Sequence, residues 1–302
     1  MVTAPADTAP VLVTGMARSG TTWVGKMLAS GDARYIGEPL NVDYPGVFGL
    51  GVHYWYEDVA ARDAVFQRRL QFWCSGGFDT LDQLKSVQRP ADVLRVGKRY
   101  AEHLRRLLGA TRVVVKDPYA VLSLPWFAEN GFSVVVVVRH PLAVVGSMKA
   151  LGWSVDPANF LSQPQLMQTT LAEFREELTD QLRSGAGDVE RNALLWKMIH
   201  RTVTASDLPI TVVRQEDLSR DADHGFAELF RSLGMAYTAR ARARIRKSSG
   251  EMNPVELSTT HSVRLHSAAS LKRARTRLAT DEAARVLAIT SDTAEAFYGD
   301  PT

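Results

Sequence analysis

The sequence predicts an α/β fold in which a mainly parallel central sheet is flanked by helices on both faces, giving three layers. Three short runs of mostly β-branched residues support this, at positions 11–14, 111–117 and 132–140. Each run is apolar at its centre and bounded by polar residues, which is typical of parallel strands covered on both faces. Helical patterns follow the first and third runs, so helices are available to cover the sheet.

Length and composition allow one large globular domain or two modest ones. The chain has 302 residues, of which 45% are hydrophobic and 23% charged, which suffices for a substantial core. No linker composition or internal repeat divides the sequence, so we expect a single domain over residues 1–302, with residues 1–10 flexible. Cys74 is the only cysteine, which excludes an intramolecular disulfide and a cysteine-based metal cluster.

Charge and hydropathy limit the partners and the location. The net charge is +3 and the pI is about 9.0. The basic residues are scattered until the last quarter of the chain, so we expect no nucleic-acid partner. No apolar run reaches the roughly 18 residues of a membrane helix, and residues 1–10 lack the basic and apolar regions of a signal peptide. We therefore expect a cytoplasmic protein without a transmembrane segment.

The first element is a strand at residues 11–14, followed by a turn rich in Gly, Ser and Thr and by a helix expected from Thr21 to Gly31. Gly15 and Gly20 have the separation found in nucleotide triphosphatase loops, but Thr21 replaces the lysine that reaches the β and γ phosphates. Backbone N–H groups at a helix start bind phosphate without a lysine. The loop therefore predicts a phosphate-bearing ligand and argues against triphosphate cleavage, although such turns also occur in α/β proteins without ligands.

The next two elements are a short extended segment at residues 33–40, which carries Glu38, and a loop-rich stretch at 41–77 that contains many aromatic residues. The aromatic side chains are explained either by core and lid packing or by a substrate pocket.

Two clear strands follow, and both end in charged residues. Lys116 and Asp117 end the run at 111–117, and Arg139 ends the next. Ligands bind beyond the carboxyl ends of the strands in open α/β sheets. A triphosphatase carries a metal-holding Asp at such a strand end, whereas here Arg139 stands there. Arg139 is therefore expected to neutralise negative charge on the ligand. A helix follows, with Pro141 in its first turn.

The second half of the chain is mainly helical. Helical patterns run from about 166 to 207, and a last strand is expected within residues 209–218. A helix at 226–235, a basic segment at 239–278 and a final helix at 279–298 complete the chain. The basic run is either a solvated helix face or part of a lid.

Two motifs resemble the sulfotransferases that use 3′-phosphoadenosine 5′-phosphosulfate (PAPS). Residues 17–23 read Ala-Arg-Ser-Gly-Thr-Thr-Trp, close to the first phosphate loop of that family. Arg139 and Ser147 have the separation of the pair that holds the 3′-phosphate. The resemblance covers residues 11–28 and 113–148 well and hardly touches 41–90. It implies a P-loop sulfotransferase-type fold, PAPS as co-substrate without a metal, and these donor-binding residues: Arg18, Ser19, Gly20, Thr21, Thr22, Trp23, Arg139 and Ser147.

The catalytic base is inferred from the same resemblance. Where the cytosolic members carry a histidine, this chain reads Lys116-Asp117-Pro118. Residues 37–40 instead resemble the glutamate-bearing strand of the carbohydrate and tyrosylprotein branches. The resemblance therefore implies Glu38 as the general base. Lys116 and Arg18 would neutralise the leaving group, and Asp117 would orient Lys116.

Other roles for these residues are open at this point. Glu38 could simply pair with a neighbouring arginine such as Arg34, and His53 and His140 are alternative bases. Residues 41–90 would form an insertion or lid on the acceptor side.

The last strand and the basic segment depart from the family. This chain has Gln215-Glu216-Asp217 where the family has Tyr-Glu-Asp on the strand, so adenine packing is expected to depend on Trp23. Residues 248–280 occupy the place of a basic lid over the donor, without its glycine-rich signature. Within that lid we assign three further donor contacts: Ser248, Arg264 and Lys272.

The resulting hypothesis is an enzyme that transfers a sulfuryl group from PAPS to a hydroxyl of a carbohydrate, phenol or natural-product acceptor. Two alternatives are a small-molecule kinase with a degenerate loop and a non-catalytic nucleotide-binding module. The sequence leaves the oligomeric state open, a homodimer included.

Overall fold

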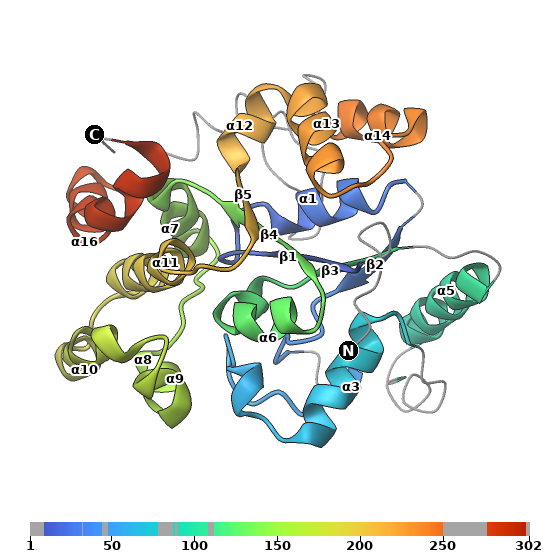
Figure 1. Cartoon of the computed structure of the whole chain (residues 1–302). Coiled ribbons are helices and arrows are strands. Elements are labelled where there is room, and N and C mark those ends of the chain that lie inside the picture. The colour runs from blue at the N-terminus through green and yellow to red at the C-terminus, as the bar shows by residue number, and fades with distance from the viewer. Residues whose placement is uncertain are drawn as a thin grey trace.

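A computed structural model describes residues 9–31, 33–43, 48–77, 87, 90–107, 112–249 and 277–299. Five parallel strands form one sheet in the order β2-β3-β1-β4-β5 (Figure 1). Their bounds are β1 Val11–Thr14, β2 Arg34–Gly37, β3 Val113–Lys116, β4 Ser133–Val138 and β5 Ile210–Arg214. The predicted α/β class with a parallel sheet is confirmed.

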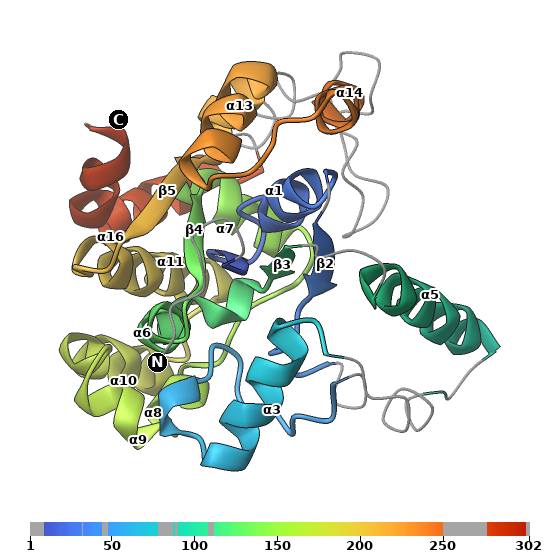
Figure 2. The same ribbon diagram turned by 45° about the vertical axis from the view of Figure 1, so that its right-hand side comes forward.

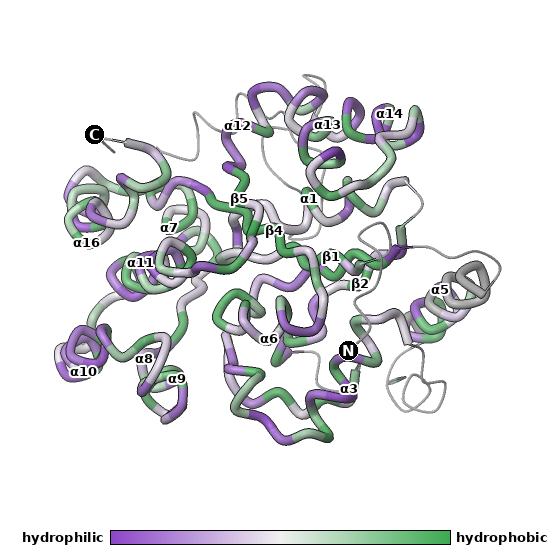
Figure 3. The backbone as a smooth tube through the Cα atoms, in the orientation of Figure 1, coloured by the Kyte–Doolittle hydropathy of each residue, from purple (hydrophilic) through white to green (hydrophobic). Residues whose placement is uncertain are grey.

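The alternation of side chains along the strands divides the core into two layers. Leu12 and Val136 point to one face of the sheet, whereas Val13 and Val135 point to the other. Because successive side chains of a strand point to opposite faces, continuous valine runs such as β4 are buried on both sides. Figure 3 shows the hydrophobic segments gathered around the sheet, while α10 at the periphery is mostly hydrophilic.

Helices cover both faces. One face packs against α1 (Thr21–Leu28), α12 (Gln215–Arg220), α13 (Ala222–Ser232) and α14 (Ala239–Ser249). Most of the other elements contribute to the core on the opposite face or extend it: η1 Val59–Ala61, α3 Ala64–Cys74, η2 Pro118–Ser123, α6 Leu124–Glu129, α7 Pro141–Lys149, α8 Pro157–Leu161, α9 Pro164–Gln168, η3 Ala172–Phe174, α10 Arg175–Ser184, α11 Asp188–Thr204 and α16 Thr280–Tyr298. Helix α5 (Pro90–Leu107) stands apart from the sheet in Figures 1 and 2.

Two sequence predictions need correction. Residues 215–217 were expected on the last strand, but β5 ends at Arg214 and Gln215 begins α12. Acidic side chains at Glu216 and Asp217 favour a helix start, because they interact with the positive end of the helix dipole. The first helix also ends earlier than expected, at Leu28. None of the helices within the described ranges has both the length and the apolar character needed to cross a membrane.

Candidate active site

The predicted phosphate loop connects β1 to α1. A Cβ atom at Gly15 would overlap the carbonyl oxygen of Val137, so only glycine fits where the loop passes β4. Gly20 caps α1 in the left-handed conformation, with a φ of 96°. The hydroxyl oxygen of Ser19 is buried and bonds to no residue that the structure describes. Buried polar groups are normally paired, so this hydroxyl fits a loop that receives an anion at the positive end of α1.

Arg18 extends from this loop toward α7. Its Nε donates a hydrogen bond to the hydroxyl of the buried Ser147 at 3.1 Å. Its guanidinium carbon lies 5.8 Å from the ring centroid of Trp153, which follows α7 and is 39% exposed. Burial lowers the pKa of Arg18, and the positive charge of Arg277 lowers it further. A cation held in this environment is stabilised by a bound anion.

Arg139 follows β4 and lies beside Arg18. Its Nη1 donates to the carbonyl oxygen of Arg18 at 3.0 Å, and its Nε is buried without a partner among the described residues. Burial lowers the pKa of Arg139 to about 10; the carboxylate of Glu216 opposes this shift, while Arg18 and Arg277 add to it. Arg139 and Ser147, predicted as a pair from their spacing, therefore both contact Arg18.

Glu216 holds the end of β4 in place and was not assigned a role from sequence. Its Oε1 accepts a hydrogen bond from the backbone N–H of His140 at 2.9 Å, and its Oε2 accepts from the Tyr298 hydroxyl at 3.1 Å. The final helix, α16, is thereby attached to the residue after Arg139. The acidic helix start at residues 216–217 was a usable signal for Glu216, but Tyr298 carries no local motif.

Trp23 and Ser248 form a contact between α1 and α14. The indole N–H of Trp23 donates to the Ser248 hydroxyl at 2.8 Å, and its ring meets Phe226 edge to face at 5.1 Å. Ser248 in turn donates to the carbonyl of Ile245 at 2.8 Å. These contacts fix the orientation of the Trp23 ring. The other two predicted lid residues, Arg264 and Lys272, lie outside the described residues.

Glu38 and Lys116 form an ion pair at the carboxyl ends of β2 and β3. The Nζ of Lys116 pairs with Glu38 Oε1, and the Asn41 amide donates to Glu38 Oε2 at 2.6 Å. Lys116 is only 3% exposed. The alternative partner considered from sequence, Arg34, donates to the carbonyl of Gly76 at 2.6 Å. Glu38 thus lies next to the lysine assigned to the leaving group.

Asp117 supports the turn that carries Glu38. Its Oδ2 accepts from the backbone N–H of Leu40 at 2.6 Å, and its Oδ1 accepts from that of Tyr119 at 3.0 Å. The sequence-based hypothesis that Asp117 orients Lys116 is therefore corrected, since its hydrogen bonds go to the backbone instead. Burial raises the pKa of Asp117 to about 7; the two N–H groups oppose that shift, and the charge of Glu38 adds to it.

The two candidate histidines lie in different surroundings. His53 is exposed, and its ring centroid is 6.4 Å from that of Tyr54. His140 is buried, and its ring packs against Tyr298 at 5.1 Å.

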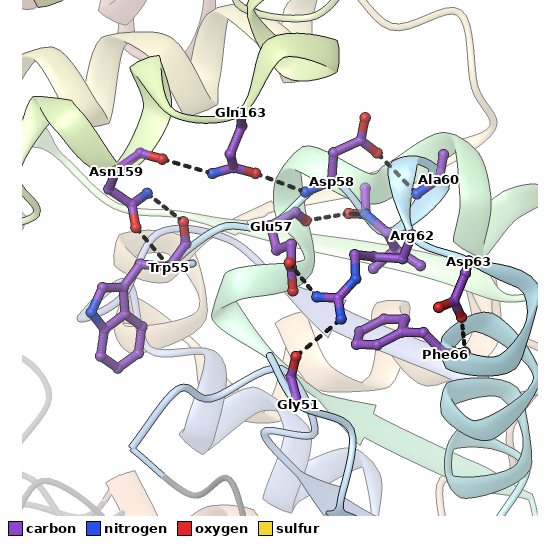
Figure 4. Close-up of polar contacts among 12 residues, drawn as sticks. Gly51, Trp55, Glu57, Asp58, Ala60, Arg62, Asp63, Phe66, Asn159 and Gln163 are labelled. Carbon is purple, nitrogen blue, oxygen red and sulfur yellow. Dashed lines mark hydrogen bonds and ion pairs between the residues drawn. The ribbon is translucent and has the colours of Figure 1, made fainter. Parts of the chain in front are cut away.

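Residues 55–59 are fixed against the body of the protein (Figure 4). The Asn159 side chain accepts from the Trp55 N–H at 2.9 Å and donates to its carbonyl at 2.7 Å. The Asp58 N–H donates to Gln163 at 3.3 Å, and Glu57 pairs with Arg62.

Tyr56 connects this segment to the phosphate loop. Its buried hydroxyl accepts a hydrogen bond from the backbone N–H of Ala17 at 3.3 Å. No sequence signal joins these residues, which are 39 positions apart. Within the described residues, Tyr56 (φ 58°), Arg18 (φ 74°) and Glu38 (φ 54°) are the non-glycine residues with positive φ.

Comparison with known proteins gives one family. The sulfotransferase family matches residues 10–239. No curated protein matches the chain. Among solved structures, the chain is similar to the sulfotransferase domain from the curacin biosynthetic pathway, with 15% identity and a TM-score of 0.44 over 93% of this chain and 96% of that one. It is also similar to sulfotransferase STF9 from Mycobacterium avium, with 16% identity and a TM-score of 0.41 over 96% and 77% of the two chains.

Proposed function

Because the chain belongs to the sulfotransferase family, we propose that it transfers a sulfuryl group from PAPS to an acceptor hydroxyl on a carbohydrate, phenol or natural product. The observation that carries this proposal is the cluster of Arg18, Arg139 and Ser147 beside the phosphate loop. PAPS has a 5′-phosphosulfate and a separate 3′-phosphate, so it needs two anion sites at a fixed separation.

The described residues fit such a donor. The loop amides and the unpartnered Ser19 hydroxyl would hold the 5′-phosphosulfate at the start of α1. Arg139, with its unpartnered Nε, and Ser147 would hold the 3′-phosphate. Arg277 adds positive charge near both arginines and would be a further donor contact, which the sequence did not single out. Trp23, fixed by Ser248, would pack near adenine.

Glu38 would act as the general base. The acceptor oxygen forms a bond to sulfur while the bond from sulfur to the 5′-phosphate breaks, and the hydroxyl proton passes to the Glu38 carboxylate. Pairing with Lys116 favours the ionised form of Glu38. Once Glu38 is protonated, Lys116 loses its counter-charge, and its ammonium can then neutralise the oxygen of the leaving phosphate together with Arg18.

Calorimetry with adenosine 3′,5′-bisphosphate, ADP and ATP, each with and without Mg²⁺, tests the proposal. We expect the bisphosphate to bind most tightly and without Mg²⁺. Preference for ATP with Mg²⁺ would instead favour a kinase. Tight binding of the bisphosphate without sulfuryl transfer to any acceptor would favour a non-catalytic module.

A further inference from the structure

Two aromatic rings lie together near the turn that carries Glu38. The ring centroids of Trp55 and Tyr119 are 4.6 Å apart, with 48° between the ring planes. The Asn159 side chain forms hydrogen bonds to both the N–H and the carbonyl of Trp55, and the N–H of Tyr119 donates to the Asp117 carboxylate. Both rings are therefore held at fixed positions by their backbones.

The polar atoms of both rings are available to a ligand. The Tyr119 hydroxyl and the Trp55 indole N–H bond to no residue that the structure describes, and neither is among the buried unpartnered atoms. Both side chains are half-buried. A tyrosine or tryptophan that is packed on one side and open at its polar tip is typical of binding surfaces.

Tyr119 lies close to the proposed base. The Asp117 carboxylate bonds to the N–H of Tyr119 and to that of Leu40, two residues after Glu38. One buried side chain therefore fixes both backbones. Burial raises the pKa of Tyr119, and the neighbouring Tyr56 and Glu38 add to this shift.

The amide side chains near Glu38 and Trp55 already form hydrogen bonds within the protein. Asn41 donates to Glu38 and accepts from the Asp43 N–H, Asn159 is bonded to Trp55, and Gln163 is bonded to the Asp58 N–H. A sugar presents several hydroxyls, each of which would need a partner when desolvated. A phenol presents one hydroxyl and an apolar ring. Among the described residues, this surface suits the phenol.

We propose that Trp55 and Tyr119 bind the ring of a phenolic acceptor, with its hydroxyl at Glu38; this rests on the proposed sulfuryl transfer. The phenol oxygen forms a bond to sulfur, and the phenolic proton goes to Glu38. The donor's bridging oxygen keeps the electron pair of the broken bond and leaves with adenosine 3′,5′-bisphosphate. Ring stacking and the Tyr119 hydroxyl thus select the acceptor.

The test compares 2-naphthol with methyl glucoside as acceptors for PAPS-dependent transfer. We expect kcat/KM for 2-naphthol to be about 100-fold higher, because a buried sugar would leave hydroxyls unpaired. Tyr119→Phe and Trp55→Leu should each raise the KM for 2-naphthol by about 10-fold while leaving bisphosphate affinity within about twofold. Tyr237→Phe, which removes a hydroxyl on the opposite face of the sheet, is the matched control.

Fluorescence titration of 2-naphthol into the protein saturated with adenosine 3′,5′-bisphosphate separates the two proposals and does not depend on turnover. Failure of the wild-type protein to bind adenosine 3′,5′-bisphosphate would overturn the proposed function. Normal bisphosphate binding, with preference for methyl glucoside or with 2-naphthol affinity unchanged in Trp55→Leu, would overturn only the phenol proposal. Melting temperatures check that both variants fold.

Discussion

The site has two sides that differ in how their charges are balanced. On the phosphate side, defined by residues 15–20 with Arg139 and Ser147, no ion pair joins Arg18 or Arg139 to a carboxylate of the described residues. On the Glu38 side, the Lys116 ammonium is paired with the Glu38 carboxylate. The carboxylate of Glu216 partly offsets the charge of Arg139 without an ion pair, so an anionic ligand would supply a direct counter-charge on the phosphate side, whereas Lys116 already has one in Glu38.

The two sides should therefore differ in how strongly they depend on the charge of a ligand. Buried cations without anions lower stability and favour binding of an anion. A balanced pair has no such need, so the Glu38 side is expected to select its ligand by shape and by single hydrogen bonds. Variants on the two sides should therefore fail in different measurements.

The largest effect is expected from Glu38→Gln. The amide keeps the size of the side chain but cannot accept the acceptor proton, so kcat should fall by roughly 10²–10⁴-fold with donor affinity nearly unchanged. Because Lys116 loses its counter-charge, the melting temperature should fall as well. Steady-state kinetics and calorimetry on the same sample measure both. His53→Ala and His140→Ala serve as controls; a near-normal kcat in Glu38→Gln with a large loss in either histidine variant would reassign the base.

Arg139→Ala lies on the phosphate side and should weaken binding of the donor nucleotide. We expect affinity for adenosine 3′,5′-bisphosphate to fall by about 1.5–3 kcal/mol through loss of a charge-assisted contact, and affinity for AMP to fall much less. Calorimetry with the two nucleotides gives the difference directly, and the exposed Arg220→Ala is the matched control. Equal losses for both nucleotides would contradict a 3′-phosphate role.

Tyr56→Phe removes the hydrogen bond that joins residues 55–59 to the phosphate loop. The Ala17 N–H would lose its acceptor, which should lower the free energy of unfolding by about 1–3 kcal/mol. The measurement is urea unfolding, with the half-buried neighbour Tyr54→Phe as control. Equal stability of the Tyr56 variant and the wild type would mean that the link is dispensable.

Asp117→Asn should affect donor binding and turnover least, because the expected change is in the pH dependence of stability. The folded pKa of about 7 exceeds the unfolded value of about 3.9. The folded state thus binds the extra proton, and this contribution to stability is full below about pH 4 and lost as the pH rises through about 7. The variant should lack that decline. Melting temperatures from pH 4 to 8 test this, and parallel curves for the two proteins would refute it.

The two motifs of the phosphate side were recognisable in the sequence because each of them is a short local pattern. The turn at 15–20 and the Arg139–Ser147 pair are local patterns, and parallel strands bring their carboxyl ends to one edge of the sheet. The Tyr56–Ala17 and Glu216–Tyr298 contacts join positions 39 and 82 apart. Such contacts depend on how whole elements pack, which periodicity does not encode.

The same limit applies to the Glu38 side. Glu38 and Lys116 were each predicted to take part in the reaction, but the ion pair between them was not predicted. Asp117 was given a partner from adjacency in sequence, whereas the turn geometry directs its oxygens to two backbone N–H groups. Short-range backbone bonding, which a sequence pattern does not specify, decided the outcome.

The left-handed backbone at Arg18, Glu38 and Tyr56 bears on how this enzyme can be engineered. A side chain in that conformation costs roughly 1–2 kcal/mol, whereas glycine adopts it freely. Glycine at these positions would relieve that backbone cost only by giving up the side-chain contacts that each residue makes. It would also remove the proposed base, the proposed leaving-group cation and the hydrogen bond from residues 55–59 to the phosphate loop. Thermostabilisation of this chain should keep these three residues fixed and search elsewhere.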